Sequence, residues 1–320
     1  MPETQPNPII LDTDIGDNVD DALALAFACQ CPELNLVGVT TGFCDPHRRA
    51  EIALSLLDTL GFDDVRVAPG LGKPLLHSWP SRPARLHSSG YFSSRKPDRL
   101  DADAFLVKTV ADILRPWKDE VETTTCMRYT AFYPAFTVCC IGPLTNLALA
   151  LMKNPAWTSE IRIVLMGGMI SAERPETNIS ADPDAARIVF DSGGDITMVG
   201  LDVTLQCQLT AEQVERIKAC GHPHTTFLAR MIDAWMAESN RLPVLHDPLA
   251  VAMCFDSSLC TVQRMRIGIK SSSEPPGALT VDCGFAQSGI KVCTQVDRDR
   301  FMTLFLDRIC SPARLRSNRA

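Results

Sequence analysis

The sequence predicts an α/β protein that forms a single domain over residues 1–320. We expect a mostly parallel, Rossmann-like central sheet flanked by helices, plus a small antiparallel excursion of strands near the C-terminus. Short apolar runs alternate with amphipathic runs along most of the chain, which is typical of βαβ units. Several apolar runs end in acidic, threonine or glycine residues, and parallel sheets bind ligands beyond the carboxyl ends of their strands. With 320 residues, 46% of them hydrophobic, the chain can build one large core.

The predicted elements follow from the length and periodicity of each run. Short apolar runs predict strands at residues 8–11, 34–41, 65–68, 136–141, 161–166 and 196–201. Helical spacing predicts a helix that opens at residues 20–21 and further helices at 48–60, 102–114, 144–152, 183–191, 211–219, 225–240 and 246–254. The antiparallel strands are expected at 264–270, 279–282 and 290–294, and a last helix at 298–310. We expect loops at 72–99 and 122–135, and flexible tails at 1–7 and 312–320.

Composition narrows the class of protein. Lys and Arg total 31 and Asp and Glu 38, a net charge of −7, which argues against general binding to nucleic acid or to an anionic membrane. The chain has no uninterrupted apolar stretch of about 18 residues, so we expect no membrane span. Residues 1–7 lack a signal-peptide core. The 13 cysteines lack a regular spacing and are expected to be reduced thiols of a cytoplasmic protein.

Five aspartates crowd into ten residues directly after the first apolar strand: Asp12, Asp14, Asp17, Asp20 and Asp21. A single acid at a strand end or a helix start is most often structural. Five of them repel one another unless a cation or trapped protons neutralise the charge. Hard cations such as Ca²⁺ and Mg²⁺ prefer oxygen ligands. The segment therefore predicts a metal site.

The geometry of this segment assigns different tasks to its members. Strand alternation places Asp12 and Asp14 on one side and Thr13 on the other. Asp20 and Asp21 suit the positive end of a helix, but adjacent helical residues diverge by about 100°. One of the two is therefore expected to coordinate the metal while the other faces a water or the substrate.

Two rival metal or phosphate motifs do not fit. An EF-hand loop needs its glycine later, whereas Gly16 stands where the third ligand belongs. The aspartyl-phosphate phosphatase pattern also begins with Asp-x-Asp after a strand. It requires Thr or Val at the position of Gly16, and it does not use the pair Asp20-Asp21.

Three later segments place polar residues at predicted strand ends or helix starts, at residues 141–146, 166–183 and 246–250. Each has an ordinary structural explanation when taken alone. Thr145 or Asn146 could cap a helix, Asp182 precedes Pro183 as a helix cap would, and Asp247 is an acid at a helix start. Glu176 and Asn178 have no obvious capping role.

Together these segments resemble the inosine–uridine-preferring nucleoside hydrolases. The resemblance is strong over residues 8–255 and extends to the remainder. It is carried, in this order along the chain, by Asp12-Thr13-Asp14, Asp20-Asp21-Ala22, Gly142-Pro143-Leu144-Thr145-Asn146, Met166-Gly167-Gly168, Glu176 with Asn178, and His246-Asp247-Pro248.

The resemblance implies a Ca²⁺-dependent hydrolase of N-ribosidic bonds that releases a free base and ribose and forms a homodimer or homotetramer. It implies Ca²⁺ ligands at the Asp14, Asp21 and Asp247 carboxylates and the Thr145 carbonyl, and Asp20 as the general base for water. It places Asp12 beside the metal shell and the ribose, Glu176 and Asn178 on ribose hydroxyls, and His246 near the leaving base as its proton donor. His87 matches a histidine of a lid motif, and Asp45 stands where an asparagine of the substrate site is expected.

The residue types suit this chemistry. Breaking an N-glycosidic bond builds positive charge on the sugar, and surrounding carboxylates stabilise that charge more than they stabilise the neutral substrate. Histidine is a natural acid near neutral pH for a departing heterocycle.

Several features depart from the family pattern. The turn after Gly16 is two residues longer, which brings Asp17 close to the pocket. Residues 169–175 form a short segment without a match for the asparagine that contacts the 5′-hydroxyl, and 122–135 are an apparent insertion. Tyr91, Phe92, Tyr133 and Trp235 are candidates for stacking on the base, although aromatic residues at helical spacing more often belong to a core. The alternatives are a hydrolase of an unusual ribosylated compound, a catalytically silent metal- or ribose-binding relative, and another metal-dependent hydrolase.

Overall fold

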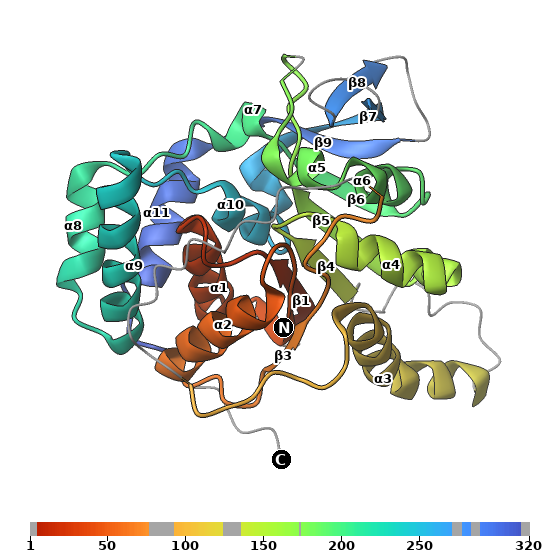
Figure 1. The fold of residues 1–320 in the computed structure, drawn as a ribbon, viewed down its shortest axis with the longest axis horizontal. Coiled ribbons are helices and arrows are strands. Elements are labelled where there is room, and N and C mark those ends of the chain that lie inside the picture. Colours follow the sequence, from red (N-terminus) through yellow and green to blue (C-terminus); the bar gives the residue numbers. More distant parts are fainter. Residues whose placement is uncertain are drawn as a thin grey trace.

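A sheet runs through the centre of the protein, with helices on both of its faces (Figure 1). The computed structural model describes residues 5–76, 93–123, 136–172, 174–270, 277–282 and 289–314. Within this part the sheet has nine strands in the order β3-β2-β1-β4-β5-β6-β9-β7-β8. The strands are β1 Asn7–Thr13, β2 Leu34–Thr41, β3 Arg66–Pro69, β4 Phe136–Cys140, β5 Ile161–Met166, β6 Asp195–Val199, β7 Cys260–Lys270, β8 Ala278–Asp282 and β9 Ile290–Val296.

The pairing confirms the predicted mixture of parallel and antiparallel strands. All neighbours from β3 to β6 are parallel. Strand β9 pairs in parallel with β6 and antiparallel with β7, and β7 pairs antiparallel with β8. The strand order reverses between β1 and β4, because β2 and β3 extend the sheet on one side of β1 and the later strands extend it on the other. Such a switch point opens a crevice at the carboxyl ends of the two strands.

Two hydrophobic clusters hold the helices against the sheet. Alternation along β1 sends Ile9 and Leu11 into one cluster and Ile10 into the other. The first cluster joins the sheet to α1 Asp20–Gln30, α2 Pro46–Leu60, α8 Ala211–Ala219, α9 Pro223–Ser239, α10 His246–Met253 and α11 Arg298–Ile309. The second joins it to α3 Ala102–Thr123, α4 Thr145–Lys153 and α6 Pro183–Phe190.

The observed boundaries differ from the predicted ones for local reasons. Helices α2 and α9 begin earlier than predicted, because Pro46 and Pro223 occupy the first helical turn. Helix α3 continues to Thr123 instead of ending at 114, so the expected loop at 122–135 starts inside a helix. Two short helices were not predicted, α5 Thr177–Ala181 and α7 Leu201–Thr204. Strand β6 ends at Val199, so residue 201 belongs to a helix and not to the predicted strand.

Both predicted tails contain residues that are tied to the core. Asn7 already belongs to β1, and its N–H donates to the Glu33 carbonyl at 2.9 Å. Gln30 donates to the Pro312 carbonyl at 3.1 Å, and its side-chain oxygen accepts from the Arg314 N–H at 2.9 Å. The eleven cysteines within the described ranges are free thiols, as predicted. Over those same ranges, no helix is both long and apolar enough to cross a membrane.

Candidate active site

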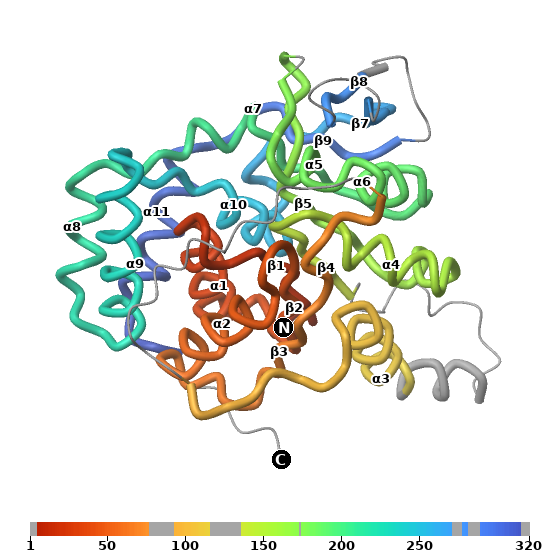
Figure 2. Tube along the Cα trace, in the orientation of Figure 1, coloured from red at the N-terminus to blue at the C-terminus, as the bar shows by residue number. Residues whose placement is uncertain are grey.

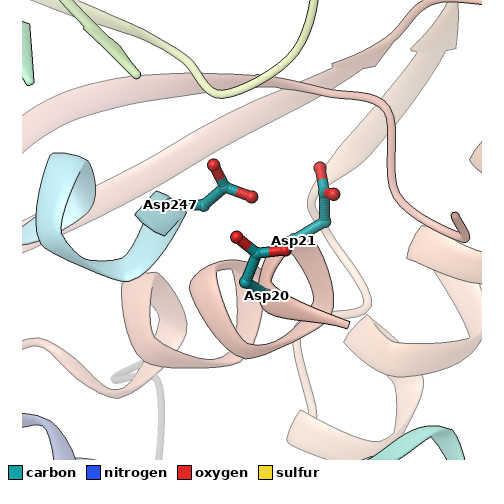
Figure 3. Close-up of side chains that lie close together, drawn as sticks. All are labelled: Asp20, Asp21 and Asp247. Carbon is teal, nitrogen blue, oxygen red and sulfur yellow. The ribbon is translucent and has the colours of Figure 1, made fainter. Parts of the chain in front are cut away.

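Three buried aspartates meet at the N-termini of two packed helices. Asp20 and Asp21 lie in the first turn of α1, and Asp247 lies in the first turn of α10. One carboxylate oxygen of each residue lies within 4.8 Å of the other two, and all three side chains are buried. Figure 3 shows the three side chains close together at the starts of the two helices. Figure 2 shows how α1 from the start of the chain and α10 from its last quarter come side by side. We call these three residues the acidic trio.

The electrostatics of the acidic trio require neutralisation. Burial raises the pKa of Asp20 to about 7, and the charge of Asp14 adds to this rise. Burial also raises the pKa of Asp21 and of Asp247 well above the ordinary value, again with a contribution from neighbouring carboxylates. The neighbouring Asp20 side chain adds to the rise at Asp247 through its charge and through hydrogen bonding. The Oδ1 atom of Asp20 is buried without a hydrogen-bond partner among the described residues. An all-oxygen set with an unpartnered buried carboxylate oxygen fits a hard cation.

Asp12 is a buried carboxylate near the end of β1 that holds two neighbouring side chains in place. Its carboxylate accepts hydrogen bonds from Thr40 Oγ1 at 2.6 Å and from Asn146 Nδ2 at 2.9 Å. Burial raises its pKa to about 6. Asp12 does not line the cavity described below, whereas Asp14 does. The predicted alternation fails here because β1 ends at Thr13. The Thr13 hydroxyl, expected to point away, instead donates to Asp21 Oδ1 at 2.5 Å.

Arg49 fixes the long turn between β1 and α1, and sequence reasoning missed it. Its guanidinium is fully buried and donates four hydrogen bonds. These reach the carbonyls of Phe43, Asp14 and Ile15, and the Asp17 carboxylate at 2.9 Å. The predicted approach of Asp17 to the pocket is confirmed, since Asp17 lines the cavity. Nothing in the helical pattern of residues 46–60 marks one arginine as buried, so the sequence gives no signal for this contact.

A cavity of about 420 Å³ lies over the acidic trio, within the usual size range for small-molecule sites. Apolar walls are supplied by residues at strand ends and in α7, and polar groups come from the turn, from α5 and from α10. Its lining consists of Asp14, Asp17, Asn18, Asp20, Asp21, Phe43, Ile141, Met166, Arg174, Pro175, Glu176, Thr177, Asn178, Leu201, Leu205, Arg241, His246 and Asp247.

Glu176 and Asn178 line the cavity and form hydrogen bonds to backbone groups at the ends of β4 and β5. Glu176 caps α5, accepting hydrogen bonds from the N–H groups of Asn178, Ile179 and Gly168 at 2.8, 3.1 and 3.1 Å. The sequence suggested no capping role for Glu176, and this expectation was wrong. Asn178 Nδ2 donates to the carbonyls of Ile141 at 2.9 Å and Met166 at 3.1 Å. Both side chains are buried, and both line the cavity.

His246 lines the cavity from the start of α10. Its Nδ1 shares a hydrogen bond of 2.7 Å with the Thr204 hydroxyl of α7. Burial lowers the pKa of His246 to about 4, so the imidazole is neutral near pH 7. When Thr204 donates to Nδ1, the ring proton lies on Nε2.

Two predicted site residues, Thr145 and Asp45, stand at helix starts and are not among the residues that line the cavity. Thr145 starts α4, and its hydroxyl donates to Asp182 Oδ2 at 2.7 Å. Asp182 caps α6 ahead of Pro183, as predicted. Asp45 is exposed and caps α2 by accepting from the Arg48 N–H at 3.1 Å, outside the cavity lining. The expectation of a substrate contact for Asp45 rested on its position after the second strand, where a helix cap is also found.

Of the aromatic residues predicted to stack on the base, only Trp235 lies within the described residues. His87, Tyr91, Phe92 and Tyr133 lie outside the described residues. Trp235 packs against the first hydrophobic cluster. Phe43 lines the cavity instead, with a left-handed backbone at φ 66°. Sequence alone gives little reason to select a single Phe after a strand.

The fold and the site define an α/β protein with a buried acidic cluster beneath a cavity of small-molecule size. The chain belongs to the inosine-uridine preferring nucleoside hydrolase family, whose sequence profile matches residues 9–303. This confirms the resemblance seen in the sequence and the enzyme class, hydrolases of N-glycosidic bonds. The general dependence of the family on a metal agrees with the acidic trio.

Relatives of known structure or activity match over nearly the whole chain. The pyrimidine-specific ribonucleoside hydrolase RihA of Escherichia coli O1:K1 is 32% identical over 321 aligned positions, covering 94% of this chain and 98% of the relative. The structure of a purine-preferring ribonucleoside hydrolase from Gardnerella vaginalis is 31% identical, with a TM-score of 0.79 and coverage of 95% and 98%. The structure of a plant nucleoside hydrolase, PpNRh1, is 25% identical, with a TM-score of 0.81 and coverage of 96% and 100%.

Proposed function

We propose that this protein is a Ca²⁺-dependent ribonucleoside hydrolase that adds water across the N-glycosidic bond and releases a free base and ribose. The observation that carries the proposal is the acidic trio, which lies beneath a cavity at the switch point of the sheet. The expectations of a cytoplasmic homodimer or homotetramer belong to the same proposal.

The proposed metal ligands are the carboxylates of Asp14, Asp21 and Asp247 and the main-chain carbonyl of Thr145. Support comes from the burial and the raised pKa of Asp21 and Asp247, and from the oxygen-only donor set, which suits Ca²⁺. A bound Ca²⁺ supplies positive charge that offsets the crowded carboxylates and favours deprotonation of a neighbouring water.

The proposed general base is Asp20. It lines the cavity, its Oδ1 has no hydrogen-bond partner among the described residues, and its pKa is raised to about 7. A base with a pKa near the working pH combines availability with driving force. Asp14 is the nearest rival, because it lines the same cavity and its charge acts on every member of the trio.

Ribose would lie between the acidic trio and α5. Glu176 contributes a buried carboxylate, and Asn178 has committed its amide nitrogen to two carbonyls, so its amide oxygen is the atom suited to accept from a ribose hydroxyl. Carboxylates around the ring stabilise the positive charge that develops on the sugar. Asp12 acts indirectly, by holding Asn146 and Thr40 beneath the site.

The leaving base would face His246. With a pKa of about 4, the imidazole acts as a neutral donor from Nε2 toward a base nitrogen or oxygen. The choice of base does not follow from similarity, because a pyrimidine-specific relative and a purine-preferring relative are 32% and 31% identical to this chain.

The direct test is a reducing-sugar assay with inosine, adenosine, guanosine, uridine, cytidine and p-nitrophenyl riboside, with Ca²⁺ or with EDTA. We expect ribose release that EDTA abolishes and Ca²⁺ restores. Release that persists in EDTA would refute the metal dependence. Bound Ca²⁺ with no hydrolysis of any riboside would favour the silent metal- or ribose-binding relative instead.

A further inference from the structure

The rim of the candidate active-site cavity carries two arginines that the proposed reaction does not use. Arg174 and Arg241 line the same cavity as Asp20 and His246, and both are exposed. Arg174 precedes α5 by three positions and lies two residues before Glu176. Arg241 follows α9 and lies five residues before His246.

Neither arginine serves a structural purpose that the described residues reveal. Six carboxylates line the cavity, yet neither guanidinium forms an ion pair or a side-chain hydrogen bond with any residue in the described ranges. Arg49 shows the contrast, since it is fully buried and donates four hydrogen bonds that hold the turn. Arg49 is buried and bonded to the backbone it positions, whereas the guanidinium groups of the rim arginines make no such bonds to the part of the chain that the structure describes.

The charge distribution in the cavity is divided between its floor and its rim. The floor is formed by the acidic trio and Asp14, which the proposed function assigns to Ca²⁺ and the attacking water, whereas the two exposed guanidinium groups lie at the rim. Arginine offers a planar fork of donors that matches carboxylate and phosphate oxygens. An anionic group can therefore be held at the rim while the glycosidic bond lies over the floor.

We infer that the substrate is a ribonucleoside that carries an anionic substituent, a phosphate or a carboxylate, which the rim arginines bind. This inference rests on the proposed function. Arg174 lies two residues before Glu176, which is on the proposed ribose side of the cavity, so we assign it to a phosphate on the ribose. Arg241 lies five residues before His246, which is proposed to face the base, so we assign it to a carboxylate on the base.

The test compares substrates that differ only in the anionic group. The values of kcat/KM are measured with Ca²⁺ for uridine, uridine 5′-monophosphate and orotidine, and for inosine and inosine 5′-monophosphate. Hydrolysis of a monophosphate adds water across the glycosidic bond and gives the free base and ribose 5-phosphate, so release of the base is followed. The variants are Arg174→Gln and Arg241→Gln, and the matched control is Arg115→Gln, an exposed arginine on α3 away from the cavity.

We expect the wild-type protein to prefer an anionic substrate over its neutral counterpart. The ratio of the two kcat/KM values should fall by about tenfold to a hundredfold in Arg174→Gln for the monophosphates or in Arg241→Gln for orotidine, the range for a lost hydrogen bond to a charged group. The control should keep the wild-type ratio. Added NaCl should lower the preference, because the rim is exposed and its charges are screened.

Equal or better hydrolysis of neutral nucleosides than of all anionic counterparts would overturn the inference and leave the proposed function intact. A preference that both rim variants retain would also overturn it. Failure to hydrolyse any substrate, neutral or anionic, would remove the proposed function and this inference with it.

Discussion

At the scale of single residues, Asp20 and Asp14 are assigned different roles, the general base and a Ca²⁺ ligand, and the two roles can be separated by experiment. If Asp20 is the general base, Asp20→Asn should fold and bind Ca²⁺ but lose about 10²–10⁴-fold in kcat, the usual contribution of acid–base catalysis. Asp14→Asn should mainly weaken Ca²⁺ binding, because Asp14 is a proposed ligand. Calcium titrations and kcat measured at saturating Ca²⁺ separate the two effects. A full kcat in Asp20→Asn would transfer the base role to Asp14.

His246 supports a second prediction about a single side chain. His246→Ala should slow hydrolysis of natural nucleosides far more than that of p-nitrophenyl riboside, whose leaving group needs no proton. Burial lowers the pKa of His246 to about 4, so its imidazole stays neutral from pH 6 to pH 8. Titration of His246 should therefore not change kcat in that range. Equal losses on both substrates would show that His246 does not assist the leaving group.

Residue roles were predictable only where the chemistry shows in the sequence. The crowding of Asp12, Asp14, Asp20 and Asp21 is visible in the chain itself, and the structure brings three acids, including the distant Asp247, into one cluster. The burial of Arg49 depends on how α2 packs against the turn after β1, which no local pattern records. Asp45 was assigned to the substrate site because it stands where the family has an asparagine after the second strand, whereas the structure shows it capping α2.

At the scale of elements, the junction of β1 and β4 depends on a glycine. A Cβ at Gly142 would lie 2.8 Å from Asp14 Oδ1 and 3.0 Å from the Asp14 backbone nitrogen. Gly142→Ala should therefore displace the Asp14 carboxylate and weaken Ca²⁺ binding. We expect the Kd for Ca²⁺ to rise by about tenfold or more, which corresponds to a loss of about 1.4 kcal/mol of binding free energy. Gly194→Ala is the control, since its nearest neighbour would lie at 3.4 Å. Unchanged Ca²⁺ affinity in Gly142→Ala would show that Asp14 is not held there as a ligand.

The long elements followed from the sequence, whereas the short ones did not. Strands β2 and β5 and helix α8 have the predicted boundaries, because each is a continuous run with clear periodicity. Helices α5 and α7 span five and four residues, too few for a helical period to appear. They matter to the site, since α5 is capped by Glu176 and α7 carries Thr204 against His246.

At the scale of the whole molecule, the buried carboxylates should govern stability without metal. The pKa of Asp20 rises from 3.8 to about 7 on folding, and that of Asp12 to about 6. The metal-free folded protein therefore binds more protons than the unfolded chain across this window, and its stability falls as the pH rises from 4 through 7. In EDTA we expect a lower Tm at pH 8 than at pH 5.5.

Calcium should reverse this trend, because it stabilises the folded state and binds deprotonated ligands best. The rise in Tm on adding Ca²⁺ should be larger at pH 8 than at pH 5.5. Differential scanning calorimetry with exposed Asp112→Asn as the control variant measures both effects. A Tm in EDTA that climbs between pH 5.5 and 8 would contradict the account of the buried acids.

The central claim is that Asp14, Asp21 and Asp247 hold a Ca²⁺ on which ribonucleoside hydrolysis depends. The most direct measurement is a calcium titration of the chelator-treated protein, followed in parallel by calorimetry and by ribose release, for the wild-type protein and Asp247→Asn. We expect one site per chain, with the same midpoint for binding and for activity, and a midpoint shifted to much higher Ca²⁺ in the variant. Full activity before any Ca²⁺ binds, or an unchanged midpoint in Asp247→Asn, would contradict the claim.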